Sequence, residues 1–144
     1  MPGWVESACA EYIKRMPREL ELRITEIKPE KRAAGNNTEN IQLLEAKRIL
    51  ETVKHDYLIA CDEHGIEITT LQLAEKLTNW LSLGRDISLV IGGADGLHPT
   101  IKNKADLLWG LSKLTLPHAF VRVLLCEQLY RAHTVIIHHP YHRE

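Results

Sequence analysis

The chain has 144 residues and a formal net charge of −1, which suits one domain covering residues 1–144. Because this charge gives no general attraction to nucleic acid, an RNA partner must be met by a local basic patch. Its three cysteines, an odd number, each lie in an apolar segment, which favours reduced thiols in a cytoplasmic protein over a secreted disulfide framework. The sequence contains neither a signal peptide pattern nor an apolar run of about 18 residues, so we expect no export and no membrane span.

The amino-terminal part of the sequence predicts two helices and a strand. Apolar residues at i, i+4 spacing predict a helix over Trp4–Met16, which Pro17 ends. The alternation in Leu20–Ile24 predicts an edge strand with one charged face. Lys28–Thr38 has no periodicity and predicts a loop, with Thr38 or an asparagine capping a helix whose apolar residues span Leu43–Val53.

The central part predicts two buried strands separated by a helix. Tyr57–Cys61 is a short apolar run that ends at the turn Asp62–Gly65, which is typical of a central strand. Thr69 or Thr70 can cap a helix with its apolar face over Leu73–Leu81. A second central strand is expected over Ile87–Ile91.

The carboxyl-terminal part predicts a final strand and a long helix. After the loop Gly92–Gly96, a short polar helix follows Pro99, and alternation over Leu107–Leu111 predicts the last strand. Pro117 stops this segment and permits a helix to begin. Apolar residues over His118–Ile137 cover more than the stripe of about 100° that a one-sided surface helix needs. We therefore expect burial on two sides, the second against another subunit of a homodimer.

Five helices alternating with four strands predict an α/β domain with a mainly parallel sheet. Ligands of such sheets bind beyond the carboxyl ends of the strands, here Cys61-Asp62, Gly92–Gly96 and Ser112–Pro117. The glycines would let backbone amides approach a ligand, although an ordinary tight turn would have the same composition. The loop is neither GxGxxG nor GxxxxGK, so a triphosphate-binding P-loop is rejected.

The carboxyl-terminal tail is the second candidate for chemistry. Tyr141, His142 and Arg143 offer a stacking ring, a proton acceptor and a phosphate-binding fork, as a site acting on an unpaired base would need. A frayed terminus is the alternative. His138, His139 and His142 could form a metal site, but the sequence has no matching cysteine or carboxylate cluster, so we expect no metal. The basic stretch from Lys14 to Arg32 is either an RNA-binding patch or a solvated face.

Three segments together carry a resemblance to a known family. The segments LVIGGADGL, LSKLTLPHAFVRVLLCEQLYRAHTVIIHHPYHRE and KPEKR closely resemble the RlmH family of ribosomal RNA methyltransferases in the SPOUT superfamily. The resemblance implies a SPOUT-type α/β fold with a carboxyl-terminal trefoil knot. It also implies methyl transfer from S-adenosylmethionine to N3 of a pseudouridine in the 23S rRNA of the assembled ribosome, by a homodimer. Family members carry a strand and a turn before the residue matching Met1, which this sequence lacks.

The resemblance also implies site residues. Cofactor contacts fall on Cys61, where the family has leucine, on Gly93, and on Ser112, Lys113, Leu114, Thr115, Leu116 and Pro117.

The chemistry needs no metal, and the proton on N3 requires an acceptor, for which His142 and Asp62 are candidates. Arg143 would hold phosphate or favour the N3 anion. Substrate contacts are expected from Lys28, Lys31, Arg32, Tyr141 and Arg143. The competing hypothesis is a catalytically weak or inactive ribosome-associated binding module that has kept the SPOUT fold.

Overall fold

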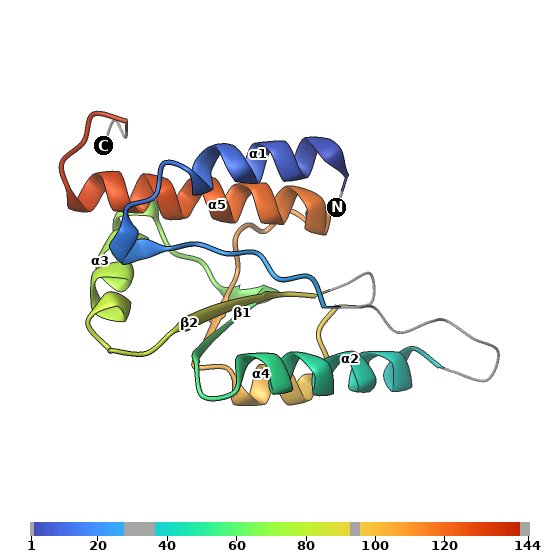
Figure 1. Cartoon of the computed structure of the whole chain (residues 1–144). Coiled ribbons are helices and arrows are strands. Elements are labelled where there is room, and N and C mark those ends of the chain that lie inside the picture. Colours follow the sequence, from blue (N-terminus) through green and yellow to red (C-terminus); the bar gives the residue numbers. More distant parts are fainter. Residues whose placement is uncertain (1, 28–36, 93–95, 142–144) are drawn as a thin grey trace. The chain divides into compact units, whose positions relative to one another are not determined.

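The computed structural model describes residues 2–27, 37–92 and 96–141. These residues form two compact units, each described here by itself. The sheet unit contains Thr25–Glu67 and Asp86–Thr115, and the helical unit contains Met1–Ile24, Ile68–Arg85 and Leu116–Glu144. Figure 1 follows the chain through both units.

The sheet unit is built on three parallel strands, β1 (Tyr57–Ile66), β2 (Ile87–Ile91) and β3 (Leu107–Trp109). Their order is β2-β1-β3, so β1 is the central strand. The predicted parallel α/β architecture is confirmed for the described residues. Asp106 fixes the start of β3, because its N–H donates to the Leu58 oxygen at 2.7 Å and its carboxylate accepts from the Leu58 N–H at 2.9 Å.

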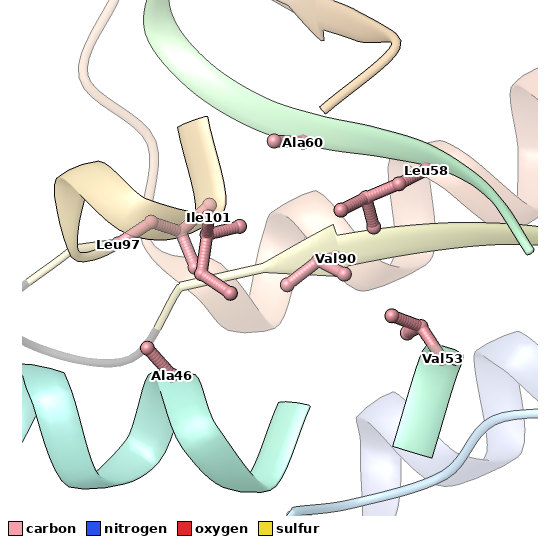
Figure 2. Packing of buried hydrophobic residues seen from close by; sticks show 7 residues of the cluster. All are labelled: Ala46, Val53, Leu58, Ala60, Val90, Leu97 and Ile101. Carbon is pink, nitrogen blue, oxygen red and sulfur yellow. The ribbon is translucent and has the colours of Figure 1, made fainter. Parts of the chain in front are cut away.

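The helices α2 (Thr38–Val53) and α4 (Pro99–Lys104) share an apolar core with this sheet. Leu58 and Ala60 lie two residues apart on β1 and therefore face the same side of the sheet. Figure 2 shows side chains from α2 directed at those of the strands and of α4. The buried cluster consists of Ala46, Val53, Leu58, Ala60, Val90, Leu97 and Ile101. Asn37 is the predicted asparagine cap of α2, and its side-chain oxygen accepts from the Asn40 N–H at 2.8 Å.

The helical unit contains α1 (Gly3–Ile13), α3 (Thr70–Leu81) and α5 (His118–Ile136). Both α1 and α3 pack against α5, and Figure 1 shows α1 running beside it. Val5, Cys9 and Cys126 form the buried centre between α1 and α5. The predicted cap at Thr69 is confirmed as a reciprocal pair, because Thr69 and Gln72 each accept the other's backbone N–H.

The prediction of a strand over Leu20–Ile24 is wrong. Arg18–Leu20 is a short 3₁₀ helix, and no strand is assigned from there to Ile27, the last described residue of this segment. Leu22 packs against the core between α1 and α5, whereas Ile24 is exposed. The alternation of apolar and charged residues is therefore not enough to form a strand here. A strand also needs a neighbouring backbone that pairs with its N–H and C=O groups.

The last predicted strand is shorter than expected. β3 ends at Trp109, and Leu111 lies outside it. The described residues thus contain three strands rather than the predicted four.

Within the chain, α5 packs against both α1 and α3. The second subunit expected on one side of α5 stays a prediction. An apolar strip still remains uncovered. Phe120 and Leu124 on α5 are 52% and 39% exposed, and Trp4 on α1 is 51% exposed. The rings of Trp4 and Phe120 lie 5.3 Å apart between centroids, so the strip continues from one helix to the other.

Candidate active site

The strands β2 and β3 end at the same level of the sheet. Their last residues, Ile91 and Trp109, both lie opposite Cys61, while β1 continues beyond it to Ile66. The glycine-rich segment after Ile91 and the segment after Trp109 therefore begin at the same edge, next to Cys61. Gly93, predicted to contact the cofactor, lies outside the described residues.

Two glycines that the sequence patterns did not single out fix the geometry of this edge. A Cβ on Gly65 would lie 2.6 Å from the carbonyl carbon of Trp109, and a Cβ on Gly110 would lie 2.6 Å from the Gly65 oxygen. The Gly110 N–H donates to the Ile66 oxygen at 2.8 Å. The two backbones thus touch where side chains would separate them. The available signal was a glycine directly after Trp109 and another in the turn that follows the central apolar run.

Beside this contact between Gly65 and Gly110, the strand β1 carries a bulge. Cys61 and Ile66 both pair with Trp109, so the four residues between them, numbers 62–65, form a bulge within β1. Asp62 stabilises this bulge. One of its carboxylate oxygens lies 3.2 Å from the Lys102 ammonium, and the other accepts from the His64 N–H at 3.2 Å. Both oxygens of the candidate base Asp62 are therefore engaged in structural contacts.

The surroundings of Cys61 disfavour the reactive thiolate form of its side chain. All three cysteines are free, and burial raises the pKa of the Cys61 thiol to about 12. Because the thiolate is the nucleophilic form, the thiol at the strand edge is unreactive near neutral pH. Burial likewise raises the pKa of Cys126 to about 12.

The segment after Gly110 leaves the sheet as an exposed turn. Ser112 shapes it, because its hydroxyl accepts from the Leu114 N–H at 3.0 Å. Lys113, Leu114 and Thr115 are exposed, with Leu114 72% exposed. Leu116 and Pro117, the other predicted cofactor contacts, belong to the helical unit, where Pro117 is the residue before the first turn of α5.

The described part of the tail ends at Tyr141, which folds back onto α5. Its ring packs edge-on against Tyr130 with centroids 4.7 Å apart, and the Arg131 guanidinium lies 4.9 Å from its centroid. Removal of the hydroxyl from water raises the pKa of Tyr141 to about 12, with hydrogen bonding to Tyr12 as the next cause.

The remaining predicted site residues, Lys28, Lys31, Arg32, His142 and Arg143, lie outside the described residues.

The described residues offer neither a metal site nor a membrane-spanning helix. Over residues 2–27, 37–92 and 96–141 no three His, Cys, Asp or Glu side chains come together as metal ligands would. Within the same ranges no helix combines the length and the apolarity that crossing a membrane requires.

A three-stranded parallel sheet with helices packed on it defines an α/β protein, the class in which ligands bind beyond the carboxyl ends of the strands. Residues 1–142 match the sequence model of the family described as "Predicted SPOUT methyltransferase". The chain belongs to the SPOUT methyltransferase family.

Relatives with a more specific name cover nearly the whole chain. A protein of Methylobacillus flagellatus named ribosomal RNA large subunit methyltransferase H is 66% identical over 144 residues, covering 100% of this chain and 93% of that protein. Proteins of the same name from Burkholderia vietnamiensis and Cupriavidus necator are 51% and 50% identical, each covering 99% of this chain and 92% of the relative. The resemblance stated from the sequence segments is confirmed at the level of the family.

We expect Gly110→Ala to destabilise the protein by about 1–3 kcal/mol, because the new methyl group would clash with the backbone of Gly65, which cannot move away as a flexible side chain could. Urea unfolding followed by circular dichroism measures this. Gly3→Ala is the matched control, since nothing lies within 4 Å of its Cβ position. Equal stability of the two variants would contradict the close glycine contact.

Proposed function

We propose that this protein methylates N3 of a pseudouridine in the 23S rRNA of the assembled ribosome, in the cytoplasm, with S-adenosylmethionine as methyl donor. The observation that carries the proposal is the 66% identity, over the whole chain, to a protein named ribosomal RNA large subunit methyltransferase H. The register of the sheet supports it, because the implied cofactor residue Cys61 lies level with the ends of β2 and β3, and Ser112–Thr115 come shortly after the end of β3.

The residues at this edge suit a sulfonium cofactor. S-adenosylmethionine supplies an activated methyl group when bound. Cys61, Gly93 and Ser112–Pro117 would hold it, largely through backbone groups. A thiolate beside a sulfonium would compete for the methyl group, and burial keeps the Cys61 thiol protonated with its pKa raised to about 12. The close glycine contact at Gly110 fixes the backbone from which Ser112 follows.

The tail and the basic loop would provide the chemistry and the RNA contacts. His142 would accept the N3 proton, since both oxygens of the other candidate, Asp62, are engaged by Lys102 and His64. Arg143 would favour the N3 anion by its charge and hold phosphate. Because the net charge is −1, Lys28, Lys31 and Arg32 would form the local attraction to RNA, with Tyr141 and Arg143 at the tail.

The protein would act as a knotted homodimer. The trefoil knot implied by the resemblance would fix the cofactor loops rather than leave them mobile. Trp4, Phe120 and Leu124 form an exposed apolar strip over α1 and α5, which a second copy would cover. The tail of one subunit would then serve the cofactor site of the other.

We expect S-adenosylmethionine to bind the purified protein and Gly93→Val to weaken binding by about tenfold to a hundredfold, because a branched Cβ would fill the space above the glycine. Isothermal titration measures both, and circular dichroism checks that the variant is folded. A parent protein that binds ribosomes but no cofactor would favour the inactive binding module. A folded Gly93→Val variant with parental affinity would place the cofactor elsewhere.

Light scattering should return twice the chain mass of 16.5 kDa at micromolar concentration. Phe120→Glu should shift the protein toward the monomer, since a buried unpaired carboxylate is costly. Leu81→Glu on α3 is the matched control, because Leu81 is similarly exposed at 45% but lies outside the apolar strip. A monomeric parent, or equal behaviour of both variants, would refute this interface.

Mixed dimers test whether each site borrows its tail. One subunit carries Arg143→Ala and the other Gly93→Val, and each variant alone should be inactive on unmethylated ribosomes. If the tail crosses to the partner, one site of the mixed dimer has both defects and the other has neither. Activity should then return to about half of the parental value. A mixed dimer without activity, beside active parental dimers, would show that each tail serves its own site.

A further inference from the structure

The chain turns back sharply after α5. His138 has a φ of 58°, and the His139 N–H donates to the Thr134 oxygen at 2.8 Å. The Tyr141 N–H donates to a ring nitrogen of His139 at 3.1 Å, which extends the turn. The turn returns Tyr141 to the helix at the level of Glu127, Tyr130 and Arg131.

The Tyr141 ring is held by two different contacts. Tyr130 meets it edge-on at 4.7 Å between centroids, within the range of favourable aromatic pairs. The Arg131 guanidinium lies 4.9 Å from its centroid, within the range of a cation–π interaction. The hydroxyl adds a hydrogen bond to Tyr12, while its distance to the Glu127 carboxylate, 3.4 Å, is at the limit of a hydrogen bond.

The two residues that hold the ring are themselves fixed. The Arg131 Nε donates to both Glu127 carboxylate oxygens, at 3.0 and 3.1 Å. Tyr130 is buried and lies 6.1 Å from the Tyr12 ring, and the Arg15 guanidinium is 5.7 Å from its centroid. The raised pKa of Tyr141 agrees with a side chain partly withdrawn from water.

We infer that Glu127, Tyr130 and Arg131 are positioning residues that hold the carboxyl-terminal tail through Tyr141. A fixed Tyr141 limits where the next residues can go, because each residue spans at most about 3.6 Å. His142 and Arg143 are the next two residues of the sequence. The inference rests on the proposed function, in which these two residues act on the RNA base, and it adds the residues that determine where they act.

The test combines a structural and a kinetic measurement on the purified protein. Arg131→Ala removes the cation from the Tyr141 ring, and Tyr141→Phe retains the ring while removing the hydroxyl contacts. Lys76→Ala on α3 is the matched control for loss of a cation, as it changes no residue of the anchor. Carboxypeptidase trimming past residue 141, followed by mass spectrometry, measures release of the tail.

We expect trimming of Arg131→Ala to be about tenfold faster than that of the parent, because the tail detaches more often. Tyr141→Phe and Lys76→Ala should be trimmed at the parental rate. On unmethylated ribosomes Arg131→Ala should lose about tenfold in kcat with an unchanged KM for S-adenosylmethionine, and Tyr141→Phe should retain most of the activity. If Arg131→Ala does not fold, Glu127→Gln, which preserves volume, replaces it with the same expectations in smaller measure.

The outcomes separate the anchor from the proposed function. Parental trimming rates in Arg131→Ala would overturn the anchor. Fast trimming with parental kcat would overturn its positioning role and leave only local packing. If the parent does not methylate ribosomes at all, the proposed function fails, and the trimming rates alone decide whether the anchor exists.

Discussion

The contact between the backbones of Gly65 and Gly110 is the constraint on which the geometry of the candidate active site depends. It lies directly after the last residue of β3, where the Gly110 N–H donates to the Ile66 oxygen. It also lies beside the bulge of residues 62–65, whose flanking residues Cys61 and Ile66 both pair with Trp109. Close backbone approach is possible only without a Cβ, so two residues without side chains define the edge from which the implied cofactor segment leaves.

At this edge of the sheet we expect the protein to position a bound cofactor rather than to supply reactive side chains of its own. The Cys61 thiol is kept protonated by burial, and the Asp62 carboxylate is bonded to Lys102 and to its own loop. Neither side chain is available as a nucleophile or a base without disrupting the edge. A cofactor that brings its own activated methyl group suits such surroundings, because the protein then has only to align the donor and the acceptor.

The sequence predicted the helices, the caps and the parallel strands, because each depends on local pattern. Asn37 and Thr69 cap the helices expected to begin there, and the apolar runs at Tyr57 and Ile87 are strands. The sequence pattern gave wrong predictions where contacts between distant parts of the chain determine the secondary structure. Leu20–Ile24 alternates without a partner strand, and Leu111 continues an alternation that the contact at Gly110 has already ended. The roles of Gly65 and Gly110 could not be predicted, since composition does not show which backbones touch.

Tyr141 illustrates the same limit at the tail. The sequence predicted an aromatic ring available for stacking on a base, which follows from its residue type alone. In the helical unit the ring is bound by Tyr130 and Arg131, which precede it by 11 and 10 residues, because the turn at His138 reverses the chain. Glu127 and Arg131 lie one helical turn apart, so their pairing is local, whereas their contact with Tyr141 depends on that reversal. A positive φ is uncommon outside glycine, and here it places Tyr141 against the part of α5 that carries Tyr130 and Arg131.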